Sequence, residues 1–335
     1  MLQPSFIAEM TVMNRRQFIH TFALYGALNP FALRAQRPAP RVAYLTTLPG
    51  RTEFEEAFLD GLRALGYVDG KSILIDYRWK LDTEERLRAA LTELVDLKVD
   101  VIVTTGLGIA RAAKSATSTI PIVMTTAGDP VGAGLVANLA RPGGNVTGYS
   151  MYTSELTRKR LQVFKEAVPA LERVGALFNE RTPVRPGGAL EETEVAGGML
   201  NVKVVALPTR LPEGIGAAFT QARRSGLQGV VILSDQATIA HRAELGASAI
   251  EHRVPTMFAN KLYLKGGGLM SYGPDILEAF RRTAFYVDRI VKGARPGDLP
   301  IELAAKFELA ISQKTAKAIG VTIPPSLLAL ADHLM

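Results

Sequence analysis

The sequence of 335 residues contains no cysteine. This absence excludes disulfides, thiolate zinc sites and thiol nucleophiles, and it excludes the lipid-modified cysteine of a bacterial lipoprotein. Histidine is scarce, with four residues of which none has the spacing of a metal site. Neither the nucleophile elbow G-x-S-x-G nor the phosphate loop G-x-x-x-x-G-K-[ST] occurs. The sequence therefore predicts no metal, no cofactor and no enzymatic activity.

The charge of the chain gives no sign of a nucleic-acid-binding surface. The net charge is +7, and basic residues alternate with acidic ones along expected helices, as in Glu84-Glu85-Arg86-Leu87-Arg88. A dispersed basic surplus is typical of a solvated surface, so no nucleic-acid partner is expected. Hydrophobic residues make up 47% of the chain and charged residues 21%, the composition of a well-packed globular protein. A chain of this length is expected to form two domains.

The first 36 residues differ from the rest of the chain. Arg15 and Arg16 precede Gln-Phe-Ile in an arrangement that resembles a twin-arginine export signal. An apolar stretch over residues 18–33 follows, and Ala35 supplies a small residue for cleavage. We predict an export signal over residues 1–36, cleaved near Ala35, and a periplasmic mature protein. The alternative is an ordinary amphipathic N-terminal helix. A stable membrane span is not expected, because the apolar stretch is too short and is interrupted.

From Arg41 onward, short apolar runs alternate with longer segments of 3.6-residue period. The β-branched runs predict strands, and the amphipathic segments between them predict helices. The expected strands are residues 42–46, 72–79, 99–104, 121–125, 145–151, 174–178, 202–207, 229–233, 255–258 and 306–311. The expected helices are residues 52–65, 83–97, 106–117, 213–225, 237–252 and 274–292, with another after Pro186. This order predicts an α/β fold of parallel sheets flanked by helices.

The strand pattern occurs twice, which predicts two similar Rossmann-like lobes. Residues 41–45, 100–104 and 120–124 match residues 173–177, 229–233 and 254–258 in order, at a nearly constant offset of about 130 residues. The elements after residue 273 are too few for a third domain, so we expect them to complete the two sheets. We assign residues 41–148 plus about 274–300 to lobe 1, and residues 149–273 plus about 301–335 to lobe 2.

Polar residues follow the carboxyl ends of the expected strands in both lobes. Ligands of parallel sheets bind at this edge, where helix N-termini supply free N–H groups that favour a carboxylate. Asp129, Glu180 and Asp235 can pair with an ammonium group there. The candidate ligand residues are Thr46, Thr47, Trp79, Thr105, Gly106, Gly128, Asp129, Asn179, Thr182, Asp235 and Tyr272. For the polar candidates the alternative is a helix N-cap, and for the aromatic ones it is the core.

Residues 128–148, GDPVGAGLVANLARPGGNVTG, carry a competing signal. Gly132 opens a G-x-G-x-x-A pattern, and Glu155 stands where a ribose-binding acid is expected. A nucleotide-dependent Rossmann-type enzyme is therefore an alternative. A pyrophosphate fingerprint belongs after the first strand, however, and here Asp129-Pro130 intervenes after the fourth. We expect Asp129 to cap a short helix that contains both glycines and precedes a Pro-Gly-Gly turn.

Several longer motifs together resemble one known family. They are residues 61–70 (GLRALGYVDG), 120–123, 128–132, 141–148 (RPGGNVTG), 267–274 (GGLMSYGP), 306–309 and 324–328 (PPSLL). The chain after Arg41 thereby resembles the ABC transporter substrate-binding proteins of the tryptophan/tyrosine-transporter type. The resemblance implies a type I periplasmic-binding fold, with a hinge and an interlobe cleft.

The resemblance also implies a function. It describes a monomeric periplasmic receptor that closes its lobes on a small-molecule solute and presents it to an ABC transporter permease in the inner membrane. Of the family's ligand positions, Thr105, Asp129 and Asn179 are retained, whereas Gly128 replaces a threonine. The expected solute is an amino acid or another small carboxylate-bearing or aromatic compound. A cytoplasmic ligand sensor of the same fold is a further alternative.

Overall fold

The computed structural model describes residues 38–151, 154–182 and 188–335. The predicted export signal lies outside these residues, and the side chain of Glu155 is also outside the described part. Among the described residues, no helix combines the length and the apolar character that a membrane crossing requires.

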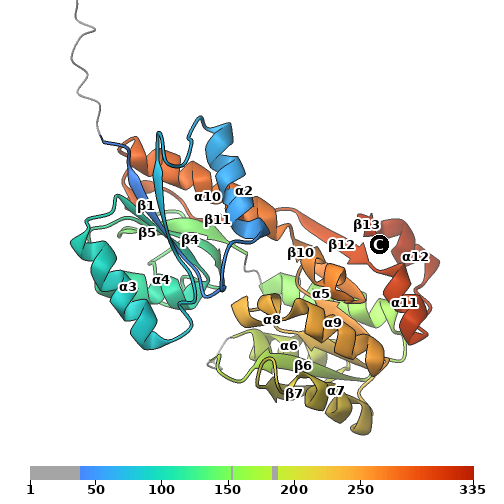
Figure 1. Ribbon diagram of the computed structural model, residues 1–335. Helices are drawn as coiled ribbons and strands as arrows, with labels where there is room; N and C mark the ends of the chain where they lie inside the picture. The colour runs from blue at the N-terminus through green and yellow to red at the C-terminus, as the bar shows by residue number, and fades with distance from the viewer. Residues whose placement is uncertain (1–37, 152–153, 183–187) are drawn as a thin grey trace, which may run out of the picture. The chain divides into compact units, whose positions relative to one another are not determined.

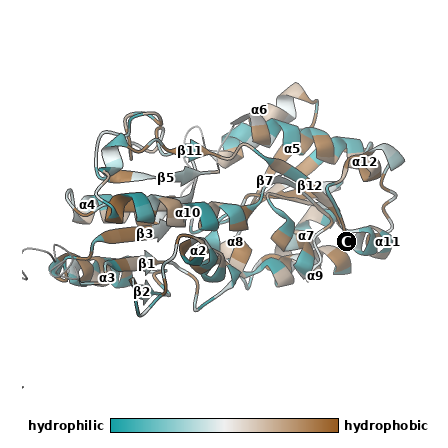
Figure 2. Ribbon diagram, turned by 90° about the horizontal axis from the view of Figure 1, so that it is seen from above, coloured by the Kyte–Doolittle hydropathy of each residue, from teal (hydrophilic) through white to brown (hydrophobic). Residues whose placement is uncertain are grey.

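The first sheet contains six strands in the order β11-β5-β4-β3-β1-β2. The strands are β1 (Arg41–Leu45), β2 (Leu74–Arg78), β3 (Val101–Thr105), β4 (Ile122–Ala127), β5 (Val146–Ser150) and β11 (Glu302–Leu303). Each neighbouring pair is parallel. All five residues of β3 are buried, as expected for a central strand covered on both faces, and β3 is largely brown in Figure 2.

Helices cover both faces of this sheet. They are α2 (Glu53–Ala64), α3 (Glu84–Asp96), α4 (Leu107–Ala116) and α10 (Ile276–Val291). Successive residues of β1 point to opposite faces. Val42 and Tyr44 pack in a cluster with α2 and α10, whereas Ala43 and Leu45 pack in a cluster with α3 and α4. Although α10 stands in the sequence between strands of the second sheet, it lies against α2 of the first sheet (Figure 1).

The second sheet contains seven strands in the order β13-β12-β10-β9-β8-β6-β7. The strands are β6 (Arg173–Asn179), β7 (Lys203–Thr209), β8 (Gly229–Ile232), β9 (Thr256–Phe258), β10 (Met270–Pro274), β12 (Phe307–Ile311) and β13 (His333–Leu334). The pairs from β7 to β10 are parallel. At one place the sheet departs from the expected parallel arrangement, because β12 is antiparallel to β10.

The path of the chain explains this antiparallel pair. β10 ends at Pro274, the chain then contributes α10 and β11 to the first sheet, and β12 begins at Phe307, directly opposite Pro274 in the register. Because β12 begins opposite the last residue of β10, the two strands run in opposite directions. Because β11 pairs with β5, the chain makes its last passage from the first sheet to the second after Leu303.

Helices also flank the second sheet. They are α5 (Ser154–Ala167), α6 (Ala189–Met199), α7 (Ile215–Arg224), α8 (Gln236–Ala240), α9 (Arg242–Glu251), the 3-10 helix η1 (Lys261–Gly266), α11 (Gln313–Ile319) and α12 (Pro325–Leu330). Residues of α5, α6, α11 and α12 share one hydrophobic cluster, and residues of α7, α9 and η1 share another. The helix predicted over residues 237–252 is two helices, because His241 leaves the helical conformation with a φ of −102° and a ψ of 28°.

A bulge in β4 shapes the carboxyl edge of the first sheet. The pairing of β4 with β5 shifts between Met124 and Ala127, and Thr126 has a φ of 54°. A positive φ is strained for a β-branched residue, and such strain is concentrated at functional sites. Gly148 on β5 has a φ of 133°, and a Cβ there would lie 2.1 Å from the carbonyl oxygen of Met124. The close approach of the two strands therefore requires glycine at this position.

We expect Gly148→Ala to destabilise the protein, because the added methyl group meets the backbone of Met124. The free energy of unfolding is expected to fall by about 2–3 kcal/mol, the upper part of the usual range for single substitutions. Urea denaturation followed by circular dichroism measures the change. The control is Gly144→Ala, since a Cβ at Gly144 meets nothing within 4 Å. Equal losses in the two variants would contradict the prediction.

Candidate functional site

Two predicted ligand residues meet at the carboxyl edge of the second sheet. Thr182 follows β6 and Asp235 follows β8, and the Thr182 hydroxyl donates a hydrogen bond of 2.6 Å to Asp235 Oδ2. Asp235 also caps α8, since its Oδ1 accepts from the Thr238 N–H at 2.7 Å. The cap and the predicted site therefore involve the same side chain. An ionised carboxylate has about four acceptor positions, so Asp235 retains capacity for a ligand.

Tyr263 extends this polar network into the interior. The residue belongs to η1 and is fully buried, and its hydroxyl lies 3.0 Å from Ser234 Oγ and 2.8 Å from Thr238 Oγ1. Burial raises the pKa of Tyr263, so the phenol is neutral at physiological pH. Residues from the ends of β6, β8 and β9 are therefore joined by hydrogen bonds around one buried ring.

Arg160 of α5 is a candidate functional residue that the sequence did not reveal. Its Nε donates to the carbonyl oxygen of Tyr272 on β10 at 3.0 Å. Burial lowers the pKa of Arg160 to about 10, with Tyr263 and Glu192 opposing that effect, so the side chain is charged at neutral pH. In the sequence it ends the run Arg158-Lys159-Arg160, which is typical of a solvated helix surface. Only the fold places this arginine beside β10.

Two further predicted residues of the second sheet, Asn179 and Tyr272, form hydrogen bonds with neighbouring protein groups. Asn179 is 9% exposed, and its Oδ1 accepts from the Arg181 N–H at 3.3 Å. The ring of Tyr272 lies 6.3 Å from the ring of Phe307, and its carbonyl oxygen binds Arg160. The structure thus gives Tyr272 a defined role through its carbonyl group. A contact of its ring with a ligand stays a prediction.

At the edge of the first sheet, the predicted threonines form hydrogen bonds with their own loops. Thr46 is fully buried, and its Oγ1 accepts from the Leu48 N–H at 3.2 Å. The Thr105 hydroxyl donates to the carbonyl oxygen of Leu45 at 3.1 Å. Thr47 is partly buried. These bonds give Thr46 and Thr105 a structural role, and a contact with a ligand stays a prediction for all three.

The carboxylate of Asp129 accepts hydrogen bonds from backbone N–H groups of the glycine-rich stretch. Its Oδ1 accepts from the N–H groups of Val131 and Gly132 at 3.0 and 2.9 Å. The predicted short helix is wrong: residues 130–134 form a turn. Gly134 ends it with a φ of 68°, a conformation that does not continue a helix. The neighbouring Gly128 contributes its carbonyl oxygen, which accepts from the Ser150 hydroxyl at 2.9 Å.

Trp79 follows β2 and stacks on Tyr77. The ring centroids are 5.2 Å apart with an interplanar angle of 2°, and Trp79 is 36% exposed. The ring of Tyr77 also lies 5.9 Å from that of Tyr44, and the hydroxyls of both tyrosines and Oε1 of Glu55 are buried without a hydrogen-bond partner among the described residues. Burial raises the pKa of Tyr77 to about 12, so its phenol is neutral. The partly exposed indole of Trp79 therefore stacks on a tyrosine whose own hydroxyl is buried.

Residues that follow strands of one sheet contact residues that follow strands of the other. Glu53 of α2 forms an ion pair of 3.0 Å with Arg242 of α9. Gly106, which follows β3 with a φ of 80°, lies beside Gln236, such that a Cβ on Gly106 would be 3.7 Å from Gln236 Cγ. The predicted position Gly106 is thus brought next to the residue that follows Asp235.

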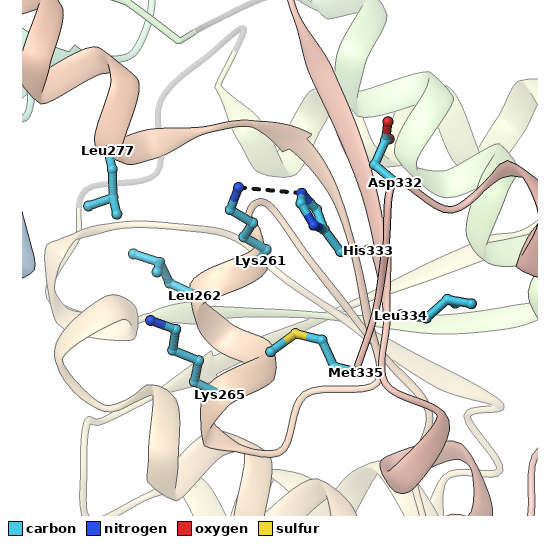
Figure 3. A pocket seen from close by; sticks show the side chains of 8 residues that line it. All are labelled: Lys261, Leu262, Lys265, Leu277, Asp332, His333, Leu334 and Met335. Atoms are coloured by element: carbon cyan, nitrogen blue, oxygen red, sulfur yellow. Dashed lines mark hydrogen bonds between the residues drawn. The ribbon is translucent and has the colours of Figure 1, made fainter.

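Two cavities lie away from these residues. Figure 3 shows one of about 390 Å³ near the C-terminus, lined by Lys261, Leu262, Lys265, Leu277, Asp332, His333, Leu334 and Met335. The other, of about 540 Å³, lies over α3 and α4. Neither is lined by a predicted ligand residue. Within the described part of the chain, no group of three or more histidine or acidic residues is arranged to hold a metal ion.

Comparison with known proteins identifies the family. The model of the family described as ABC transporter substrate binding protein matches residues 41–335. The chain belongs to this family. It is 26% identical over 284 residues to the tyrosine-binding protein of Clostridioides difficile strain R20291, a match that covers 84% of this chain and 80% of the relative. The match confirms the family predicted from the sequence motifs.

Similar solved structures confirm the fold class of two α/β lobes with the type I architecture. A conserved domain protein from Vibrio cholerae has a TM-score of 0.80 at 28% identity, covering 89% of this chain and 100% of that one. The ABC domain from Streptococcus pneumonia, solved in complex with L-Trp, has a TM-score of 0.78 at 23% identity, covering 88% and 99% of the two chains. At that identity the second likeness concerns the fold alone.

In this substrate-binding protein, Lys261 connects two passages of the chain between the sheets. Its Nζ lies 3.2 Å from Asp275 Oδ2 at the start of α10 and 2.7 Å from Glu308 Oε2 on β12. His333 Nε2 lies 3.3 Å from the same oxygen of Glu308. Burial raises the pKa of Asp275, but the hydrogen bond and charge of Lys261 outweigh it and hold the pKa below its usual value of 3.8.

This cluster predicts that stability depends on pH through Lys261. A carboxyl with a depressed pKa stabilises the fold above its ordinary pKa, and the contribution is lost as the pH falls through the folded value. Lys261→Met is expected to lower the free energy of unfolding by about 1.5 kcal/mol at neutral pH, the lower end for a charged hydrogen bond. In urea titrations, the difference from wild type is expected to narrow on acidification below about pH 4. The exposed Lys265 supplies the control variant, Lys265→Met. A difference that does not change with pH would refute the role of Asp275.

Proposed function

We propose that this chain is the extracytoplasmic solute-binding component of an ABC importer, and that its solute is an amino acid or another small carboxylate-bearing or aromatic compound. After cleavage near Ala35, the protein would reside in the periplasm as a monomer and deliver its solute to an inner-membrane permease. It would carry out no chemical reaction. Membership of the substrate-binding family supports this proposal, and so do two similar proteins, of which one is a tyrosine-binding protein and the other was solved in complex with L-Trp.

The observation that carries the proposal is the position of Asp235. Its carboxylate is held by Thr182 and Thr238 at the carboxyl ends of the strands of the second sheet. The next residue, Gln236, lies beside Gly106 of the first sheet. A ligand bound by Asp235 would therefore be close to both lobes, and it would favour the state in which they are closed. The ion pair of Glu53 with Arg242 would support the same state.

Asp129 argues against the alternative of a nucleotide enzyme. A pyrophosphate would need the free N–H groups of the glycine-rich stretch. Two of these groups, those of Val131 and Gly132, already donate to the carboxylate of Asp129. A Cβ on Gly132 would lie 2.1 Å from Asp129 Oδ2, so the glycine makes room for this carboxylate. We therefore assign the stretch to the architecture of the loop.

Thermal denaturation of the full chain with a set of small molecules tests the proposed function. We expect L-tyrosine, L-tryptophan or another amino acid to raise the melting temperature by about 3–6 °C at a concentration 100-fold above its Kd. NAD and ATP are expected to have no effect. Stabilisation by NAD or ATP, with no response to amino acids, would instead support a nucleotide enzyme.

The role of Asp235 is tested by Asp235→Asn. Asparagine is as good an N-cap as aspartate, so the melting temperature of the free protein is expected to stay unchanged. The affinity for the amino acid is expected to fall about 10–100-fold, the effect of losing one hydrogen bond to a charged group. Isothermal titration calorimetry measures this affinity. Asp60→Asn, on the exposed surface of α2, is the control. Equal affinity in wild type and Asp235→Asn would remove Asp235 from the site.

A further inference from the structure

One ion pair joins a helix that covers the first sheet to a helix that covers the second. Glu53 is the first residue of α2, and Arg242 is the first residue of α9. Arg242 Nη2 donates to Glu53 Oε1 at 3.0 Å. The two side chains are 26% and 31% exposed, whereas those of the surface pair Arg51 and Glu56 are 48% and 49% exposed. The contact between the two halves is therefore a partly buried, charged hydrogen bond.

The position of Arg242 makes it depend on an anionic partner. A helix N-terminus carries a partial positive charge, which disfavours a cation in the first turn of α9 and favours an anion in the first turn of α2. The guanidinium has two partners, because Nη2 donates to Glu53 and Nη1 donates to the carbonyl oxygen of Ile239 at 3.0 Å. If α2 moved away from α9, Arg242 would lose the only one of these partners that carries a negative charge.

Hydrogen bonds connect Arg242 through α8 to the proposed solute site. Ile239 belongs to α8, so the bond from Arg242 holds the carboxyl end of this five-residue helix. Asp235 caps the other end, where its Oδ1 accepts from the Thr238 N–H at 2.7 Å. The pair with Glu53 and a solute on Asp235 would therefore act on the two ends of one short helix.

The pair also requires that the carboxyl edges of the two sheets lie close together. Glu53 lies on the helix that follows β1, and Gly106, which follows β3, lies beside Gln236 of α8. A hinge rotation that moves α2 away from α9 breaks the bond between Glu53 and Arg242. Because the bond forms only while the two helices are in contact, it contributes to the closed state and not to the open one, and it shifts the equilibrium between them.

We propose that Glu53 and Arg242 form an electrostatic latch, which holds the two lobes closed and thereby raises the affinity for the solute. This assignment rests on the proposed function and concerns the regulation of its site. The apparent affinity for a solute is proportional to the population of the state that binds it, and the latch raises this population. By linkage, a solute bound at Asp235 strengthens the latch to the same degree. Because both side chains are partly exposed, salt weakens the latch.

Calorimetric titration of L-tyrosine into Glu53→Gln, Arg242→Gln and the double variant tests the latch. Each single variant is expected to bind about 10-fold more weakly than wild type, as for the loss of one charged hydrogen bond. The double variant is expected to lose no more than about 10-fold, because both substitutions remove the same interaction. When NaCl is raised from about 0.01 M to about 1 M, the difference between wild type and the double variant is expected to narrow.

Glu56→Gln is the matched control, because it removes a negative charge from the same turn of α2, where Glu56 pairs with Arg51 of the same lobe at 2.7 Å. It is expected to bind L-tyrosine like wild type. Small-angle X-ray scattering of the free proteins gives a readout that a purely structural role would not change. The radius of gyration is expected to be larger in the double variant than in wild type and unchanged in Glu56→Gln. A double variant whose loss of affinity equals the product of the two single losses would overturn the latch.

Failure of this proposal and failure of the proposed function give different results. If wild type binds L-tyrosine or L-tryptophan and the variants bind it equally well, the latch is refuted and the proposed function stands. If wild type binds neither compound, an amino acid of this kind is refuted as the solute, and the radius of gyration alone decides on the latch. Should Arg242→Gln fail to fold, Glu53→Gln decides the question, because it leaves the bond from Arg242 to Ile239 intact.

Discussion

Parallel strand pairing is the constraint on which the rest of this structure depends. Parallel neighbours need crossover connections, so their strands end at the same edge of the sheet. In the second sheet β6 and β8 are paired from Val174 opposite Gly229 to Leu177 opposite Ile232. This register brings the residues after both strands together and allows Thr182 to bond to Asp235, which is 53 residues away in the sequence. The antiparallel β12 is the exception, because it carries the returning chain.

Near the carboxyl edges of the strands, the structure contains a strained backbone conformation and buried polar atoms that form no hydrogen bond within the described residues. Thr126 has a positive φ, and the hydroxyl of Tyr44 and Oε1 of Glu55 are buried without partners within the described residues. The other carboxylate oxygen of Glu55 does have a partner, because Oε2 accepts a hydrogen bond of 2.8 Å from the N–H of Thr52 at the start of α2. Proteins retain strain and unpaired polar atoms where binding requires them, at a cost in stability.

Much of the fold was predictable because it depends on local physics. The β-branched run of β3, the caps of the helices and the repeated strand pattern are read within short windows, and the structure contains the corresponding elements with ends shifted by one or two residues. The glycine-rich stretch shows the limit of this approach. Its spacing alone fits a dinucleotide loop, and the carboxylate of Asp129 on its N–H groups decides otherwise.

The sequence by itself determined the α/β class, the two related halves and the family, because periodicity and contiguous motifs carry that information. It also placed Thr182 and Asp235 at strand ends. The tertiary structure alone decided that they bond to each other, that β12 runs antiparallel, and that Gly61 lets α2 approach α10, where a Cβ would lie 2.5 Å from the carbonyl oxygen of Arg281. It also placed Arg160 against the carbonyl oxygen of Tyr272, whereas its sequence neighbours Arg158 and Lys159 are exposed. Such contacts join residues far apart in the chain, and their partners are chosen by packing rather than by local preference.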